Sequence, residues 1–524
     1  MPTIERFARF KPSKVNLSQL IKFGVTPSTP QIYRSSQFLL DEIPIMLAHR
    51  VQLLRNPPPE LTVKQPFRNL ADSYEHTFHK ILEFKQKSSH LLGPEMKARL
   101  LSQSSPAGMY FTTRVSDETG PEPVILELSA SQVLSSMNVV SAVPAPGLFA
   151  RLSGMFHTRS FAVAPNVARA NPAHVQFDPN LRQTLSDTVR AYPQEVHSYN
   201  ALCQEFFSAI LADHSNDLIA LFKEVNQELF QMKITRPKQY ARKCQIDNCT
   251  RTHEYLNALH RSRISTRFLV SQHQSLYKLS YAQVSRAQFK ELQRNGNVGV
   301  IATNVSIYDI LNDAITSAEN TLINWTGLNP PEIILNCDDD LRTVCVPAHL
   351  WHIFFELVKN AMRATLENYN DASISSDGKM RETGSSRVRD TLRKDIIPPI
   401  EITVLNGTED VLIKISDRGG GIKSSELSKI SSYFYTTVSN DEISQFPVDS
   451  MTHPNSGNEV FNLVQNPNQD LQDGKAAPLA GLGYGLPLSK LYAQHFGGDL
   501  KLVSLWGYGT DAFVRLNKFG LEGS

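Results

Sequence analysis

Cysteine is scarce in this chain, with five residues among 524, and none of them forms a CxxC pair or a Cys/His pattern with metal-ligand spacing. The sequence therefore supports neither a disulfide framework nor a zinc module. A charge of one sign is also lacking, because 53 Lys and Arg residues nearly balance 51 Asp and Glu residues, for a net charge of +2. No nucleic-acid partner and no anionic membrane surface is indicated by this balance.

A membrane-spanning run is missing as well. The longest uncharged stretch, 128–150, is interrupted by prolines, serines, Gln132 and Asn138, which a bilayer core disfavours. Acidic residues are absent from 128–177, a segment rich in Ala, Ser, Val and Pro. We interpret about 88–190 as a low-order insertion without a core of its own.

The remaining composition is that of a globular protein, with 41% hydrophobic and 20% charged residues. In the first half, apolar residues recur at helical spacing and strand-like alternation is nearly absent. We therefore predict an all-α helical bundle over 1–295. Its helices are expected at 17–23, 38–54 with a bend at Pro44, 67–84, 196–232 and 253–277.

A second domain is predicted over 296–524, because the pattern changes to short alternating segments joined by turns. The expected elements are a strand at 341–346, a helix at 348–367, a hairpin at 400–416 with an Asn-Gly turn, a helix at 486–496 and a hairpin at 500–516. These elements predict an α+β layer with helices on one face of a mostly antiparallel sheet. Two polar stretches, 369–399 and 439–478, are expected to be disordered surface loops.

The helix at 348–367 carries the first candidate site. His352, Glu356 and Asn360 follow one another at intervals of four residues and share one face, together with Lys359 and Arg363. A base, its electrostatic partner and a neutral oxygen ligand could activate a hydroxyl and hold Mg²⁺. An ordinary amphipathic surface helix would show the same two-sided pattern.

Three glycine-containing motifs follow. Asp417 comes directly after a strand and precedes three glycines, so its carboxylate could accept a hydrogen bond from an exocyclic amine while the backbone approaches a flat ring. The run Gly-Leu-Gly-Tyr-Gly-Leu-Pro at 481–487 opens a helix and can form a phosphate cradle. Thr510 lies in a Gly-Tyr-Gly-Thr hairpin at 507–510. Taken singly, the Asp417 turn and the hairpin fit an ordinary capped loop and an ordinary glycine-containing hairpin better, whereas the run at 481–487 fits a phosphate cradle better than a glycine hinge.

Two common nucleotide motifs are excluded. No βαβ unit with a following acidic residue accompanies the glycines, as a dinucleotide-binding fold requires, and no GK[ST] is present for a Walker A loop.

Taken in order, the four motifs resemble the Bergerat ATP-binding fold of the histidine-kinase, gyrase, Hsp90 and MutL superfamily. Segments 348–365, 481–490 and 498–510, and the N-terminal segments 4–10, 38–48 and 262–273, resemble the mitochondrial pyruvate dehydrogenase kinases and the branched-chain α-ketoacid dehydrogenase kinase. The resemblance covers about 1–87, 190–368 and 400–517. It implies an N-terminal helical bundle followed by a Bergerat-type α/β sandwich.

The resemblance implies an ATP-dependent protein serine kinase of the mitochondrial matrix that phosphorylates and inactivates the E1α subunit of the pyruvate dehydrogenase complex. Its cofactor is Mg²⁺, with K⁺ as an optional further cation, and its partners are E1α, the E2 lipoyl domain and a second copy of the chain. Glu356 is then the general base, His352 tunes it, and Asn360 binds Mg²⁺. The implied ATP-binding residues are Lys359, Asn360, Arg363, Asp417, Gly419, Gly421, Thr436, Thr437, Gly481, Leu482, Gly483, Tyr484, Gly485, Leu486 and Thr510.

Three alternatives stay open at the level of sequence. The first is a branched-chain α-ketoacid dehydrogenase kinase. The second is a protein-histidine kinase, although His273 is followed by Gln274 rather than by the acidic residue of an acceptor box. The third is an ATP-gated binding module that transfers no phosphate.

Overall fold

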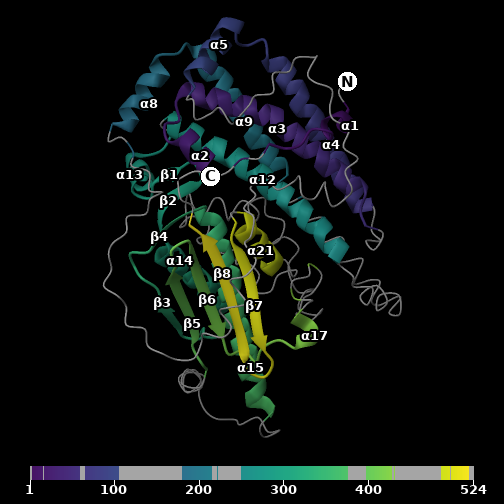
Figure 1. Ribbon diagram of the computed structural model, residues 1–524, viewed down its shortest axis with the longest axis vertical. Helices are drawn as coiled ribbons and strands as arrows, with labels where there is room; N and C mark the ends of the chain where they lie inside the picture. Colours follow the sequence, from purple (N-terminus) through teal and green to yellow (C-terminus); the bar gives the residue numbers. More distant parts are fainter. Residues whose placement is uncertain are drawn as a thin grey trace.

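The computed structural model describes residues 3–58, 65–104, 177–214, 250–375, 397–427 and 485–518, apart from isolated positions within these ranges, together with Asp217, Leu221, Ile430 and Tyr433. Within these residues the chain forms a helical part followed by a sheet with helices on one face (Figure 1). This arrangement confirms the predicted α+β class. No helix in the described part of the chain is long and apolar enough to span a bilayer.

The helical part is built on four long helices that enclose one apolar cluster. Its helices are α1 (Ile4–Phe7), α2 (Leu17–Gly24), α3 (Thr29–Arg55), α4 (Gln65–Ser88), α5 (Pro94–Gln103), α8 (Leu181–Arg190), α9 (Gln194–Asp213), α12 (Thr250–Ser280) and α13 (Arg286–Arg294). Helix α3 packs against α4, α9 and α12 (Figure 1). Phe67, Phe78, Phe207 and Phe268 supply fully buried rings to the cluster.

Helix α3 begins earlier than the sequence pattern predicts. Ser28 and Gln31 form a capping box, and Pro30 occupies the first turn, where a missing N–H costs nothing. Pro44 lies inside the helix, which continues to Arg55. The predicted bend at Pro44 stays a prediction.

The predicted insertion at 88–190 is wrong at both ends. Leu92 and Leu100 are buried in the main apolar cluster, and Leu181 and Leu185 pack with Phe289 in a smaller one. Each end is a short amphipathic helix, α5 or α8, whose few leucines are lost when composition is averaged over a long segment. The interval 105–176 lies outside the described residues.

A five-stranded sheet forms the centre of the second part. Its strand order is β3 (Ile333–Asn336), β5 (Ile400–Asn406), β6 (Asp410–Asp417), β8 (Gly509–Asn517) and β7 (Asp499–Leu505). Strands β3 and β5 are parallel and the other neighbours are antiparallel, so the pairing of both predicted hairpins is confirmed. The predicted Asn-Gly turn is wrong, because Asn406 pairs with Val411 within the strands and Gly407 N donates to Asp410 O (2.9 Å), which places the turn at 408–409.

One face of this sheet is covered by helices. Ile402, Ile413 and Val514 alternate with partly exposed residues and point to the buried side. Helices α14 (Ile307–Thr326), α15 (Pro347–Ser375) and α21 (Gly485–His495) pack with them in a second apolar cluster (Figure 1). The short helix α17 (Ser424–Leu427) follows β6 in the chain.

A small sheet connects the two parts. Its strands are β1 (Asn297–Val298), β2 (Ile301–Ser306) and β4 (Arg342–Cys345), in the order β1-β2-β4. The Gln272 side chain on α12 donates a hydrogen bond to Val298 O (3.0 Å) and accepts one from Val300 N (2.8 Å). Because β4 leads directly into α15, the small sheet ties α12 to that helix. The predicted domain boundary at 295–296 stays a prediction.

Helix α15 extends further than predicted, so the loop expected from residue 369 is wrong at its start. The interval 369–375 is helical. It is polar, but it contains no Gly or Pro to interrupt the backbone hydrogen bonds. The intervals 376–396 and 434–484, which include the predicted loop 439–478, lie outside the described residues.

Helix α14 was not predicted, and its ends suggest a stability test. The Ser306 hydroxyl accepts a hydrogen bond from Asp309 N (3.1 Å), and Gly327 closes the helix in the left-handed conformation (φ 65°). We expect Ser306→Ala to lower the free energy of unfolding by about 1 kcal/mol, the usual loss for a capping hydroxyl. Chemical denaturation measures the change. Ser317→Ala, in the middle of the same helix, is the control, and equal losses in both variants would contradict the capping role.

Candidate active site

One face of α15 brings three predicted residues into contact. The Lys359 ammonium lies 2.7 Å from Glu356 Oε1, and these side chains are 5% and 14% exposed. His352 lies one turn before Glu356, with its ring 5.3 Å from that of Tyr492 on α21 and nearly perpendicular to it. The His352 Nε2 atom is buried and has no hydrogen-bond partner among the described residues. This face therefore holds a carboxylate, a cation and an imidazole in a nearly dry environment.

The charges on this face set the protonation states. Burial alone would raise the pKa of Glu356, but Lys359 and His352 outweigh it and lower that pKa below 4.5. Burial lowers the pKa of His352, with the Glu356 carboxylate partly opposing the shift. Near neutral pH the pair is therefore an ionised carboxylate beside a neutral imidazole.

The start of α21 lies against Glu356. A Cβ atom added to Gly485 would fall 2.0 Å from Glu356 Oε2, so only glycine leaves room for the carboxylate at this position. The first turn of a helix carries unpaired N–H groups and a partial positive charge. The carboxylate thus sits between Lys359 and the first described turn of α21.

Asp417 closes strand β6 and organises the turn that follows. Its Oδ1 atom accepts hydrogen bonds from Gly419 N (2.9 Å) and Thr510 N (3.3 Å). Among the described residues, no donor forms a hydrogen bond to Asp417 Oδ2. Burial raises the pKa of Asp417, and the two backbone donors only partly oppose this shift.

Two glycines are required by close approaches in this turn. A Cβ on Gly419 would fall 2.6 Å from Ala364 on α15. Gly421 has a φ of +69°, and a Cβ there would fall 2.1 Å from Leu505 O. The turn is therefore held between α15 and the β7–β8 hairpin, and it places Asp417 beside Thr510.

The other predicted residues divide into two groups. Asn360 is exposed one turn beyond Glu356, and Arg363 Nε lies 2.6 Å from Glu367 Oε1. Leu486 is partly exposed in the first turn of α21. Outside the described residues lie Thr436, Thr437, Gly481, Leu482, Gly483 and Tyr484.

Several residues near the site were missed by the sequence analysis. Tyr492 packs against both His352 and His349, with the His349 ring 4.2 Å away. Glu367 pairs with Arg363, and its spacing of four residues on one helix was a usable signal. Nothing in the local pattern marks Tyr492, because its partners lie on another helix.

Helix α12 of the helical part contacts both Tyr433 and helix α21 of the second part. The Tyr433 hydroxyl donates to Asn257 Oδ1 (2.6 Å), and its ring stacks on His260 at 5.0 Å with an interplanar angle of 6°. Tyr433 is fully buried and belongs to the apolar cluster of the helical part. Arg261 donates to Gln494 Oε1 on α21 (3.2 Å).

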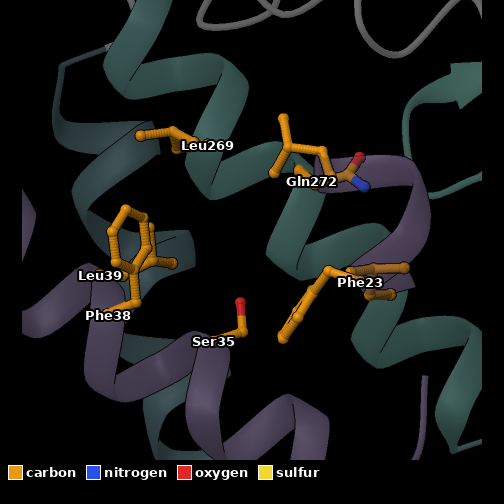
Figure 2. Close-up of a pocket in the computed structure, with 8 residues that line it drawn as sticks. Phe23, Ser35, Phe38, Leu39, Leu269 and Gln272 are labelled. Carbon is orange, nitrogen blue, oxygen red and sulfur yellow. The ribbon is translucent and has the colours of Figure 1, made fainter. Parts of the chain in front are cut away.

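A small apolar cavity also lies in the helical part. Its lining comes from α2, α3 and α12, with two polar side chains, Ser35 and Gln272, at its wall (Figure 2). The lining residues are Leu20, Phe23, Ser35, Phe38, Leu39, Leu269, Gln272 and Leu276. The cavity volume of about 20 Å³ leaves room for about one water molecule, so the cavity is a packing gap between the three helices.

Two family models match the chain. Residues 14–302 match the family described as mitochondrial branched-chain alpha-ketoacid dehydrogenase kinase. Residues 345–519 match the histidine kinase-, DNA gyrase B-, and HSP90-like ATPase family.

Curated relatives carry consistent names. A mitochondrial [pyruvate dehydrogenase (acetyl-transferring)] kinase of Schizosaccharomyces pombe is 27% identical over 98% of this chain and 95% of its own length. Isozyme 1 of Rattus norvegicus is 32% identical over 51% of this chain and 49% of its own length. The kinase of Arabidopsis thaliana is 33% identical over 52% and 59%. The alignment thus spans nearly all of the yeast relative but only about half of the other two.

Proposed function

Since the chain belongs to the mitochondrial branched-chain alpha-ketoacid dehydrogenase kinase family, we propose that it is an ATP-dependent protein serine kinase that phosphorylates and inactivates the E1α subunit of the mitochondrial pyruvate dehydrogenase complex. The observation that carries this proposal is the buried Glu356 carboxylate, held between Lys359 and the first residue of α21. The names of the relatives support pyruvate dehydrogenase as the substrate.

The chemistry follows from the proposed roles of the residues. The serine oxygen forms a bond to the γ-phosphorus while the bond from that phosphorus to the bridging oxygen of ADP breaks, and the hydroxyl proton passes to Glu356. Lys359 and Arg363 neutralise phosphate charge, and Asp417 Oδ2 accepts a hydrogen bond from the adenine amine. Phosphoryl transfer needs little more than such positioning and charge neutralisation.

Asn360 is the proposed Mg²⁺ ligand. It offers an exposed amide oxygen one turn from Glu356. The described residues contain no group of three or more His, Cys, Asp or Glu side chains that could hold a metal ion by themselves. One amide oxygen nevertheless fits Mg²⁺, which keeps several waters and takes further ligands from substrate phosphates. When bound, the ion neutralises charge on the transferred phosphate.

The helical part is the proposed docking site for the E2 lipoyl domain. The match of residues 14–302 to the kinase family supports this assignment. We further propose that the protein acts as a homodimer in the mitochondrial matrix. The matrix location rests on the partner and on the mitochondrial names of the relatives.

One phosphorylation assay tests this function. Labelled ATP is offered with purified E1 of the pyruvate complex or of the branched-chain complex, each with and without its E2 core. We expect acid-stable label on the pyruvate E1α, with more label when the E2 core is present. Label on the branched-chain E1 alone would favour the second candidate, which the description of the matching family supports. Acid-labile label on the protein itself would indicate a histidine kinase, and no transfer at all would indicate a binding module.

A further inference from the structure

Both cations that we assign to the phosphates form ion pairs within α15. Lys359 pairs with Glu356 at 2.7 Å, and Arg363 pairs with Glu367 at 2.6 Å, in each case within α15. The two pairs differ in burial, because Glu367 is 57% exposed whereas Glu356 is only 14% exposed. Glu367 can turn into water when Arg363 finds another partner, but Glu356 has no such route.

The Lys359 ammonium is held at a fixed position. It lies 4.9 Å from the centre of the Phe355 ring, and that ring is stacked on Trp351 at 4.9 Å with an interplanar angle of 8°. An aromatic face attracts a cation without using a specific N–H group. A lysine ammonium has three donors, so it can change its anionic partner without leaving the ring.

Glu356 also occupies the second positive feature of the site. Its Oε2 atom packs against Gly485 at the first turn of α21, an eleven-residue helix. The proposed function places the nucleotide phosphates at this helix start and beside Lys359. In the structure, the Glu356 carboxylate lies between the same two positive groups.

We propose that Lys359 is an exchange cation: it holds Glu356 in the nucleotide-free chain and passes from that carboxylate to a phosphate when ATP binds, so that the proton acceptor is freed only in the loaded enzyme. This inference rests on the proposed function and adds a role for Lys359 as a positioning residue for Glu356.

The burial of the pair gives the exchange a chemical consequence. While Lys359 is bound, it contributes to the lowered pKa of Glu356 and makes that carboxylate a weak proton acceptor. Once Lys359 pairs with a phosphate, it no longer lowers the pKa of Glu356. The effect of burial, which raises that pKa, is then less opposed, and the carboxylate becomes a better proton acceptor. Proton acceptance is thereby linked to the presence of the phosphate to be transferred.

A double-mutant cycle on nucleotide affinity tests the exchange without measuring phosphotransfer. The four proteins are the wild type, Glu356→Gln, Lys359→Met and the double variant, each titrated with AMP-PNP and Mg²⁺ by calorimetry. We expect Glu356→Gln to tighten AMP-PNP binding by roughly 3–10-fold, because the competing carboxylate is gone. In the Lys359→Met background the same change should alter affinity by less than about 2-fold, since the cation under competition is absent.

The matched control is Glu83→Gln on α4. Glu83 pairs with Lys87 one turn along its helix, as Glu356 pairs with Lys359, but it is exposed and distant from the site. Its loss should leave the affinity for AMP-PNP unchanged. Tightening by Glu356→Gln that persists in the Lys359→Met background would show simple repulsion between the carboxylate and the phosphates, and it would overturn the exchange.

A spectroscopic measurement keeps the test valid if Lys359→Met does not fold. In the wild type, AMP-PNP should shift one carboxylate band in the infrared difference spectrum, and Glu356→Gln should remove that shift. A spectrum without such a band overturns the exchange. If the wild type binds AMP-PNP and labels E1α but the double-mutant cycle shows no coupling between Glu356 and Lys359, only the exchange is overturned. If the wild type binds no AMP-PNP, the proposed function is overturned as well.

Discussion

Replacing Glu356 with Gln is expected to lower the rate of phosphotransfer to E1α by about 10²–10⁴-fold, the usual contribution of a general base. Gln keeps the shape of the side chain and its contact with Gly485, but it cannot accept a proton. Because the nucleotide contacts remain, the loss should appear in kcat rather than as a failure to bind ATP. A time course of E1α phosphorylation at saturating ATP measures it.

The control separates chemistry from folding. Glu83→Gln, which removes an exposed carboxylate on α4, should retain the full rate. Glu356→Gln leaves the buried Lys359 ammonium without its carboxylate, so a lower unfolding temperature is expected, and thermal unfolding must show a native transition above the assay temperature. A Glu356→Gln variant that transfers phosphate at the wild-type rate, or that loses nucleotide binding, would remove Glu356 from the role of base.

Replacing Asp417 with Asn is expected to weaken ATP binding by at least about 10-fold, since a hydrogen bond to a charged group is worth roughly 1.5–3 kcal/mol. Asn can keep an oxygen toward Gly419 N and Thr510 N, so the turn is retained. The atom that replaces Oδ2 is then an NH₂ group, which faces the adenine amine with a second donor. Calorimetric titration with ATP and Mg²⁺ measures the loss.

The same variant is expected to retain or raise the thermal stability of the chain when no nucleotide is added. Burial raises the folded pKa of Asp417 above 3.8, so its favourable contribution is present below that value and is lost as pH rises through the raised pKa. At neutral pH the ionised carboxylate therefore costs stability that Asn does not. Without nucleotide, Asp417→Asn should unfold at or above the wild-type temperature between pH 6 and about 8. A lower unfolding temperature combined with unchanged ATP affinity would make Asp417 a structural residue of the turn.

Much of the second part of the fold was predictable because its strands are amphipathic. Ile400 and Ile402, like Ile413 and Ile415, alternate with polar residues, which predicts two paired strands, although the turn lies at 408–409 rather than at the Asn-Gly pair. Strand β3 was missed because it has four residues and its parallel partner β5 begins more than sixty positions later. Helix α14 was missed although its cap residues, Ser306 and Gly327, are ordinary boundary signals.

The site was predictable only where its residues share one element. The common face of His352, Glu356 and Lys359 follows from helical spacing. The contact of Glu356 with Gly485 and the hydrogen bond of Tyr433 to Asn257 join segments more than a hundred residues apart, and no local period records them. The burial that shifts the pKa of Asp417 likewise arises from packing that no short motif describes.

The buried Tyr433 ring means that the two parts of this chain are not interchangeable modules. A residue that lies between strands β6 and β7 in sequence completes the core of the helices, where it stacks on His260 and donates a hydrogen bond to Asn257. In a chimera that joins this ATPase part to the helices of a distant relative, Tyr433 would pack against an α12 with different side chains at its contact positions. Domain grafting in this family therefore has to carry α12 and the tyrosine together as one inherited unit.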